Sequence, residues 1–276
     1  MMWPVLYENW QSFDRARDSS SVTVLGNGPS VESVDLASLE GRPTIGLSSA
    51  YRHWRRANWY PTYFACLDEV VVESHMTSIL DLLDENRFQM AFLSGRFFEL
   101  RPDMEDDPRL LNLDSVSQYW FEKRGKRRQL ARVWHPAFSS CYPEAITTGA
   151  WATRWAAFLG YTAIYLVGFD LKYATDIPGA KPSGGIRLRP EFTQDENLNY
   201  FLDEYQQSDD DFQLANPTES PVPLHIEAFR VLPHDFRVQG VGANVFSAQP
   251  ESDIAELGIF PVDRGPLAAN QPQSTS

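Results

Sequence analysis

The sequence predicts a mostly parallel α/β sheet, and three observations point to it. Short apolar runs of strand length alternate with stretches in which apolar residues recur at helical spacing. A glycine-rich turn at 26–30 follows the first of these runs directly. The run at 163–169 is apolar almost throughout, as is typical of a strand covered on both faces. This alternation favours parallel strands joined by helices, which is a Rossmann-like arrangement.

Six strands are expected, each from an apolar run bounded by turn residues. The runs lie at 21–25, 43–47, 62–67, 88–93 and 163–169, with a sixth inside 236–247 that ends in NVFS. Four helices are expected between them, at 51–57, 70–83, 148–159 and 223–232. The helix at 148–159 is apolar nearly all round, which suits a buried helix. Pro233 is expected to end the last helix.

Length and charge restrict the classes of protein. The chain has 276 residues and a net charge of −13, and its 43% hydrophobic residues are enough for one large domain. We expect an N-terminal arm at 1–20, a single domain at 21–262 and a disordered tail at 263–276. The acidic balance disfavours nucleic acid as a partner.

Two long charged segments, at 97–130 and 171–222, interrupt the strand–helix alternation. Segments of this length inside a domain are usually lids or substrate-binding insertions. The first contains a basic cluster at 123–128 and the second an acidic run at 208–211, and solvated surface is a sufficient explanation for both.

The sequence also indicates a location. No apolar run reaches the roughly 18 residues of a transmembrane helix, and the N-terminus lacks a basic-then-apolar leader. Cys66 and Cys141 form neither a disulfide framework nor a CxxC motif. We therefore expect a cytoplasmic protein. The basic cluster at 123–128 is the one feature that fits peripheral association with the inner face of a membrane.

The turn after the first strand is the strongest local signal. Its residues Gly26, Asn27, Gly28 and Ser30 allow a tight turn and a close approach of backbone to ligand. Amides that open a helix near Ser30 would favour a phosphate or another anion. Pro29 excludes a GxGxxG motif, and no Walker loop follows. An ordinary strand-to-helix turn is the alternative.

A second signal lies at the start of the buried helix. Thr147, Thr148 and Gly149 offer hydroxyls and free amides at a helix N-terminus, which again suits a phosphate. A simple threonine N-cap is the alternative. Asp170 ends the fifth strand, where ligands bind in open α/β sheets, although capping the following loop explains it equally well.

Other polar residues are expected at the same edge of the sheet. Ser48 and Ser49 end the second strand and Asp68 ends the third, so they would join Asn27. His225 stands between a proline-rich loop and a helix, where a lid would meet the site, and histidine is a base near neutral pH. The histidines form no HxxxH or HExxH motif, so no metal site is expected.

Two sequence blocks resemble a known family. VLGNGPSVESVDLASL and TTGAWATRWAAFLGYTAIYLVGFDLKY are similar to the bacterial lipo-oligosaccharide sialyltransferases of glycosyltransferase family 42. Those enzymes have a GNGPSL turn, a Ser-Gly-opened helix running into ALGY, and an IYLxGxDFY strand. The same elements recur in motility-accessory-factor glycosyltransferases and archaeal pterin diphosphokinase-like proteins. The resemblance covers about 21–70 and 145–250, and the second block has these residues in register: Thr148, Gly149, Gly160, Tyr161, Ile164, Tyr165, Gly168 and Asp170.

The resemblance implies an inverting, metal-independent transfer of a sialic-acid-like sugar from a CMP-sugar donor. The acceptor would be a glycan or glycolipid, as in lipopolysaccharide or other polysaccharide biosynthesis, with no cofactor besides the donor substrate. Asn27 would contact the donor, Thr148 and Gly149 would lie near the nucleotide, and His225 would be the general base. His225 precedes Pro250 by the interval that separates the family's histidine from its Cys-Pro-Asn-Ser motif.

The sequence also departs from the family. Family asparagines at the ends of strands two and three appear here as Ser48 or Ser49 and as Asp68. Lys172 and Tyr173 stand where the first of the family's phosphate-neutralising tyrosines would be, and a cation can serve that role.

Two other functions stay open. One is a pterin diphosphokinase-like enzyme that uses ATP and Mg²⁺ held by carboxylates such as Asp68 and Asp170. The other is a non-catalytic nucleotide-binding component of polysaccharide assembly. The donor sugar, the acceptor and the oligomeric state, a homo-oligomer included, are not determined by the sequence.

Overall fold

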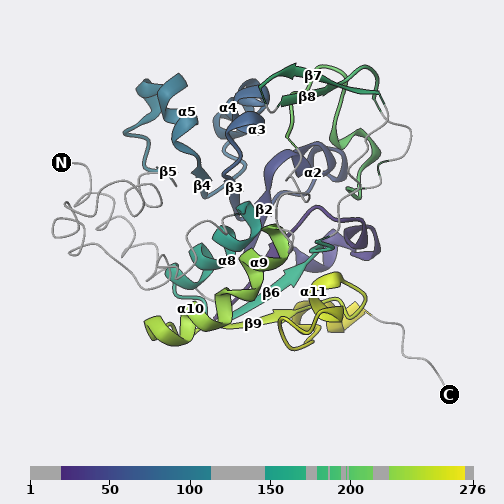
Figure 1. Cartoon of the computed structure of the whole chain (residues 1–276). Coiled ribbons are helices and arrows are strands. Elements are labelled where there is room, and N and C mark those ends of the chain that lie inside the picture. The colour runs from purple at the N-terminus through teal and green to yellow at the C-terminus, as the bar shows by residue number, and fades with distance from the viewer. Residues whose placement is uncertain are drawn as a thin grey trace.

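The computed structural model describes residues 20–112, 147–171, 179–185, 187–193, 197, 199–213 and 224–270. Within them lies a sheet of seven parallel strands (Figure 1). The strands are β1 (Ser21–Leu25), β2 (Thr44–Leu47), β3 (Tyr63–Cys66), β4 (Met90–Leu93), β5 (Leu110–Asn112), β6 (Ala163–Val167) and β9 (Asn244–Ser247). The predicted parallel α/β fold is confirmed.

The strand order is β5-β4-β3-β2-β1-β6-β9. All of the expected strands are present, but β5 was not expected, because it lies inside the segment at 97–130 that was interpreted as an insertion. Three residues at a sheet edge are too few to form a recognisable pattern. The last strand is shorter than 236–247, because residues up to Gln239 are helical.

The α-helices of the described part are α2 (Tyr51–Ala57), α3 (Glu69–Ser74), α4 (Met76–Asp84), α5 (Gly95–Leu100), α8 (Thr148–Phe158), α9 (Leu224–Arg230), α10 (Leu232–Gln239) and α11 (Asp253–Glu256). The expected helix at 70–83 is divided at His75, whose ring is held by the Tyr51 hydroxyl at 2.8 Å. The expected helix at 223–232 corresponds to α9, which ends at Arg230, before Pro233. Pro233 lies in the first turn of α10, where its missing N–H has no helical partner to lose.

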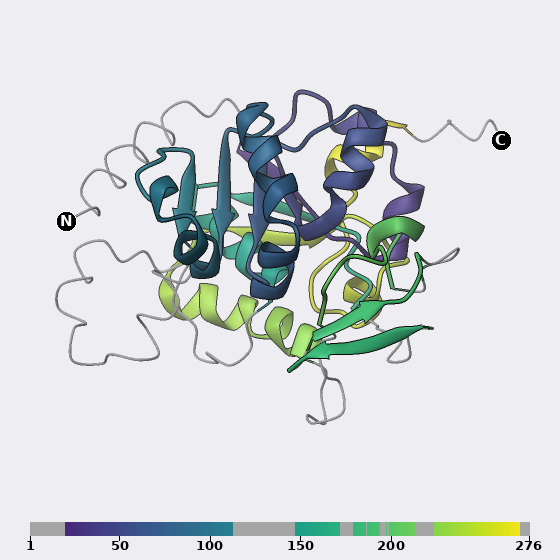
Figure 2. The ribbon, with the colours of Figure 1, turned by 90° about the horizontal axis from the view of Figure 1, so that it is seen from above.

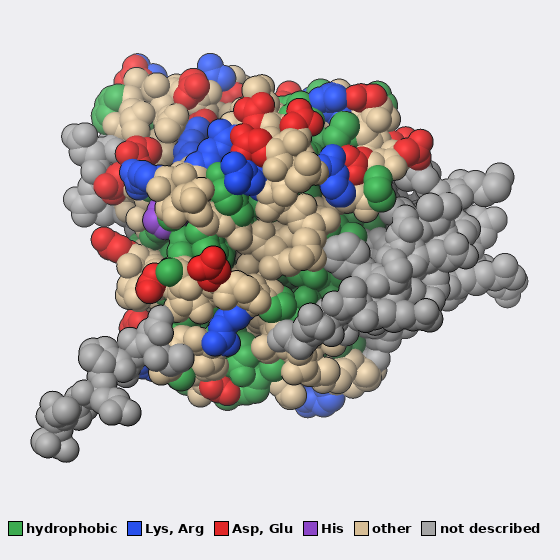
Figure 3. Space-filling model, turned by 180° about the vertical axis from the view of Figure 1, so that it is seen from behind, with side chains coloured by type: hydrophobic (Ala, Val, Ile, Leu, Met, Phe, Trp, Pro, Cys, Tyr) green, Lys and Arg blue, Asp and Glu red, His purple; other side chains and the backbone are tan. Residues whose placement is uncertain are grey.

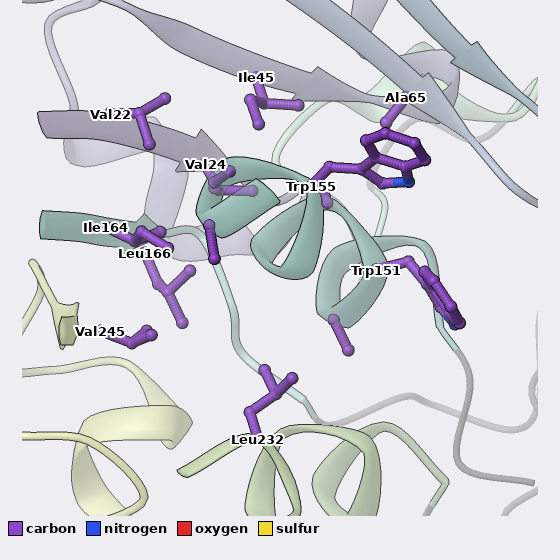
Figure 4. Packing of buried hydrophobic residues seen from close by; sticks show 14 of the residues in the cluster. Val22, Val24, Ile45, Ala65, Trp151, Trp155, Ile164, Leu166, Leu232 and Val245 are labelled. Carbon is purple, nitrogen blue, oxygen red and sulfur yellow. The ribbon is translucent and has the colours of Figure 1, made fainter. Parts of the chain in front are cut away.

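Helices cover both faces of the sheet. On one face α8, α9 and α10 pack against the strands, and on the other lie α2 to α5 with the 3₁₀ helices η1 (Pro29–Ser33) and η2 (Leu36–Leu39). Figure 4 shows α8 between the strands and the helix that carries Leu232. Trp155 of α8 is buried and stacks on Phe92 of β4 with ring centroids 4.9 Å apart. This aromatic contact fixes α8 against β4, next to the edge strand of the sheet.

A buried ion pair joins α8 to α10. Arg154 Nη2 lies 2.5 Å from Asp235 Oδ2, and the two side chains are 3% and 0% exposed. The hairpin of α9 and α10 is therefore held in a defined position beside α8.

The segment at 171–222, expected as an insertion, is partly folded. Its antiparallel strands β7 (Ala180–Gly184) and β8 (Arg187–Pro190) form a hairpin at the rim of the molecule (Figure 2). Residues 199–213, which we call the lid segment, follow and include the 3₁₀ helix η7 (Asp203–Tyr205). The segment is tied to the hairpin by a bridge between Leu188 and Phe212, and it packs on the α2 face of the sheet.

The expected tail boundary at 263 differs from the structure. Asp263 N–H donates to Ser247 O at 3.0 Å, and the 3₁₀ helix η8 (Gly265–Asn270) packs against η2. Residues 263–270 therefore belong to the domain. The remainder of the tail, the arm at 1–19 and the basic cluster at 123–128 lie outside the described residues.

The surface carries both signs of charge. Over the described part of the face in Figure 3, acidic and basic side chains are interspersed. Among the described helices, none has the length and apolar character needed to cross a bilayer.

Candidate functional site

The predicted site residues meet at the carboxyl edge of the sheet. From the interior strand β1, the chain builds β2 to β5 on one side, whereas β6 and β9 lie on the other. Ligands of open α/β sheets bind at such a switch point, outside the carboxyl ends of the strands. Asn27 follows β1, Ser48 follows β2, Asp68 follows β3 and Asp170 follows β6.

The turn after β1 (the β1 turn, residues 26–30) has four N–H groups, and protein oxygens occupy those of Gly26, Gly28 and Ser30. Gly26 N–H donates to Val167 O at 2.7 Å, and Gly28 N–H donates to Gly168 O at 2.9 Å. Ser30 N–H donates to Asp170 Oδ2 at 2.7 Å. These amides are not available to a ligand, so the expected phosphate cradle is not formed by them.

The glycines of the β1 turn allow two loops to pack closely. A Cβ on Gly26 would lie 2.3 Å from Gly168 O, and one on Gly28 would lie 2.4 Å from Asp170 Oδ2. Gly168 itself has a φ of +74°, a conformation that glycine adopts without strain. Asp170 thus holds the β1 turn through the Ser30 amide, and its expected role as a cap of the loop that follows it stays a prediction, because residues 172–178 lie outside the described residues.

Gln249 is a structural partner of this turn that was not predicted. It is buried after β9, and its Oε1 accepts the Gly168 N–H at 2.6 Å. Its Nε2 donates to Ser30 O at 2.6 Å and to Ser33 Oγ at 3.2 Å. The signal that could have identified it is its place in AQPES, where the similar family has Cys-Pro-Asn-Ser.

Asn27 is the residue of the β1 turn with an unused polar atom. Its Nδ2 donates to Leu47 O at 3.2 Å and to the Tyr205 hydroxyl at 2.7 Å. Its Oδ1 is buried, and no described group donates a hydrogen bond to it. A buried acceptor left unpaired costs about 1–3 kcal/mol, so this oxygen is suited to an O–H or N–H donor of a ligand.

The two serines after β2 face protein groups. Ser48 has a left-handed backbone, with a φ of 49°, and the nearby thiol of Cys66 is buried and donates to Asp68 O at 3.8 Å. Burial raises the pKa of that thiol, so it stays protonated. Ser49 N–H lies 3.3 Å from the Tyr205 hydroxyl. Tyr205 thus enters this edge from the lid segment, and no local sequence pattern indicated it.

Asp68 caps a helix. Its Oδ1 accepts the amides of Val70 at 2.9 Å and Val71 at 3.2 Å, which are the first amides of α3. Burial raises the pKa of this carboxyl, although the two amides oppose the shift. Its carboxylate is thus engaged with the helix that follows β3.

The N-terminus of α8 is the open counterpart of the β1 turn. Thr147 caps the helix, because its Oγ1 accepts the Ala150 N–H at 3.3 Å. Thr148 Oγ1 accepts the Leu67 N–H at 3.3 Å and so joins α8 to the end of β3. Within the described ranges, the amides of Thr148 and Gly149 have no hydrogen-bond partner. They are therefore available to an anion.

Gly149 also has a packing role. A Cβ at this position would lie 2.4 Å from Phe169 Cε1 and 3.2 Å from Phe229 Cζ. Phe169 follows β6 and Phe229 belongs to α9, so these rings bring the start of α8, the end of β6 and α9 together.

His225 lies in the first turn of α9 and is partly buried. It precedes Phe229 by four residues, so the two side chains share a face of the helix. That face points toward the start of α8, because Phe229 packs beside Gly149. Burial lowers the pKa of His225 to about 4, so the imidazole is neutral at pH 7 and can accept a proton.

Some predictions are not tested by this geometry. Lys172 and Tyr173 lie outside the described residues. In the ranges that the structure covers, no three His, Cys, Asp or Glu side chains are grouped to hold a metal ion. The metal independence of the site remains a prediction.

The fold is similar to solved structures of glycosyltransferases. The sialyltransferase CstII from Campylobacter jejuni in complex with CMP is 13% identical with a TM-score of 0.45, over 88% of this chain and 84% of that one. The α-2,3-sialyltransferase Cst-I from the same organism is 16% identical with a TM-score of 0.48, over 90% and 81%.

The MAf glycosyltransferase from Magnetospirillum magneticum is 13% identical with a TM-score of 0.38, and the match covers 90% of this chain but 36% of that one. At these identities the likeness concerns the fold alone. No family model matches the sequence, and no curated protein matches it.

Proposed function

We propose that this protein is an inverting glycosyltransferase that transfers a sialic-acid-like sugar from a CMP-sugar to a glycan or glycolipid. The proposal needs no metal or other cofactor. The observation that carries it is the pair of open amides at the start of α8, next to the helix that bears His225. Sequence resemblance supplies the cytidine nucleotide and the class of sugar.

The start of α8 suits the phosphate of the donor. Unpaired amides and the helix dipole both favour a negative charge at a helix N-terminus. The Thr148 and Gly149 amides would hold the phosphate and stabilise the charge that it gains as CMP leaves. Asn27 Oδ1 would accept a hydrogen bond from an O–H or N–H group of the donor.

His225 would act as the general base. It takes the proton from the acceptor hydroxyl while that oxygen attacks the anomeric carbon of the donor sugar. The new glycosidic bond forms as the bond from that carbon to the phosphate oxygen breaks, and CMP leaves with the electron pair. A neutral imidazole is the form that this step requires, and the lowered pKa of His225 provides it at pH 7.

A thermal-shift panel with CMP, CDP, UDP, GDP and ATP, each with and without Mg²⁺, tests the nucleotide class. A ligand at 100 times its dissociation constant stabilises a protein by about 2.7 kcal/mol. We expect CMP to stabilise without metal, and CMP-sialic acid to be consumed when a glycan acceptor is present. Stabilisation by ATP and Mg²⁺ alone, or by no nucleotide, would contradict the proposal.

A matched pair of variants tests the phosphate position. Thr148→Pro removes the Thr148 amide at the first helical position, where proline is favoured, and Thr147 already has the extended conformation that precedes proline. Thr148→Val removes the hydroxyl and keeps the amide. We expect Thr148→Pro to weaken CMP binding about tenfold, as loss of a charged hydrogen bond does, and Thr148→Val to weaken it much less. Equal affinities for the two variants would argue against a phosphate at this amide.

A further inference from the structure

We propose that Tyr205 is a positioning residue of the donor site, delivered by the lid segment, and that it acts by fixing the Asn27 side-chain amide. With Leu47 O, the Tyr205 hydroxyl would hold Nδ2 so that Oδ1 faces the ligand. The inference rests on the proposed function, because it assigns Asn27 to donor binding. It adds a residue that lies 178 positions from Asn27 in the chain.

The geometry permits one orientation of the Asn27 amide. Nδ2 lies 3.2 Å from Leu47 O and 2.7 Å from the Tyr205 hydroxyl. The opposite orientation would place Oδ1 against a backbone carbonyl, two acceptors facing each other. The Tyr205 hydroxyl also accepts the Ser49 N–H at 3.3 Å, so it joins the ends of β1 and β2.

Several contacts hold Tyr205 in place. Its ring is 6% exposed and stacks on Tyr200 with centroids 3.9 Å apart and an interplanar angle of 13°. Arg52 of α2 donates to Tyr205 O at 2.7 Å. A side chain fixed by both its ring and its backbone can define the position of a partner to within a few tenths of an ångström.

A buried charge pair fastens the lid segment beside Tyr205. Arg52 binds both oxygens of Asp210, at 2.5 and 2.8 Å, and the side chains are 17% and 7% exposed. Bidentate pairs of this kind are among the stronger hydrogen-bonded contacts in proteins. His75 Nε2 lies 3.5 Å from Asp210, and the Tyr51 hydroxyl lies 2.8 Å from His75 Nδ1, so the pair continues into the helical layer.

An exposed pair on the same elements provides a control. Arg56, also on α2, pairs with Glu204 of the lid segment at 3.0 Å, with side chains 60% and 47% exposed. Exposed ion pairs contribute little to stability. Loss of Arg56 should therefore leave Tyr205 in place, whereas loss of Arg52 should release it.

The first test needs no ligand. Hydrogen exchange of the Asn27 side-chain NH₂ is measured by NMR on the full chain, with the resonance identified by its absence in Asn27→Ala. We expect Tyr205→Phe and Arg52→Ala to speed this exchange at least tenfold, and Arg56→Ala to leave it unchanged. Unchanged exchange in Tyr205→Phe would overturn the inference.

The second test is a double-mutant cycle on CMP affinity, measured by calorimetry. Tyr205→Phe and Asn27→Ala should each weaken CMP binding about tenfold. If Tyr205 acts through Asn27, the double variant should bind no more weakly than Asn27→Ala alone. Additive losses would indicate a merely structural role and overturn the inference.

The two tests separate the inference from the proposed function. If the wild-type protein does not bind CMP, the proposed function fails, whatever the exchange rates are. If it binds CMP but the cycle is additive, the assignment of Tyr205 fails and the proposed function stands.

Discussion

The β1 turn and the start of α8 carry the same sequence signal and differ in what they offer a ligand. Both place glycine and a hydroxyl residue at the carboxyl edge of the sheet. In the β1 turn, Val167 O, Gly168 O and the Asp170 carboxylate accept three of the four N–H groups, and the Asn27 N–H has no acceptor within the described residues. At α8, Thr147 satisfies one amide, and those of Thr148 and Gly149 stay open within the described residues.

Glycine beside a helix start therefore does not by itself indicate an anion site. At both places the glycine makes room for a neighbour, Gly168 O in one case and the Phe169 ring in the other. What separates them is the presence of competing acceptors. Since the amides of Gly26 and Gly28 are already occupied, changes at these two glycines should alter stability, and changes near α8 should alter binding and turnover.

Loss of His225, which lies beside the start of α8, should have the greatest effect on turnover. His225→Ala should reduce turnover of CMP-sialic acid by roughly 10²–10⁴, the contribution of a general base. His234→Ala is the control, because His234 is exposed on the adjacent α10. Steady-state kinetics on both variants measure the effect. Near-normal turnover by His225→Ala would show that His225 is not the general base.

The second prediction concerns the β1 turn and the free energy of unfolding. Gly26→Ala places a Cβ 2.3 Å from a backbone oxygen and should lower the free energy of unfolding by about 3 kcal/mol, a typical upper cost of overpacking. Gly242→Ala is the control, since a Cβ there meets nothing within 4 Å. Urea denaturation gives both values. If Gly26→Ala kept wild-type stability but lost CMP affinity, the division between the two turns would be wrong.

The third and smallest effect is on the pH dependence of stability. Burial lowers the pKa of His225 to about 4, below the ordinary value of 6.5, so the unfolded chain binds the proton more readily. Its contribution to stability is complete above about pH 6.5 and is lost as the pH falls toward 4. His225→Gln should therefore lose about 1 kcal/mol less stability than wild type between pH 7 and 5, allowing for solvent screening. Urea denaturation at both pH values measures the loss. If His225→Gln and the wild type lose the same free energy of unfolding between pH 7 and 5, the imidazole is hydrated in the folded state.

Much of the fold could be predicted, because apolar runs report burial directly. The six expected strands and the buried α8 follow from local composition. The hairpin of β7 and β8 does not, because its residues are mostly exposed and contain glycine, proline and arginine. Nor does α10, because Pro233 in its first turn is compatible with both a helix end and a helix start.

The site was predicted less completely than the fold. Thr147 as a cap is local chemistry, and a threonine before a helix start is enough to predict it. The closure of the β1 turn depends on two backbone carbonyls more than 100 residues away, and carbonyls carry no sequence signal. The contact of Tyr205 with Asn27 depends in the same way on how the lid segment folds back.

The buried pair of Arg154 and Asp235 has a consequence for how this protein can diverge. Loss of one partner leaves a buried charge uncompensated, which costs about 3–5 kcal/mol, while joint replacement by two apolar residues of similar volume is often neutral. A single substitution at either position is therefore strongly destabilising. Simultaneous replacement of both residues can be tolerated. The spacing between α8 and α10 is thus protected against change by any single substitution at this pair.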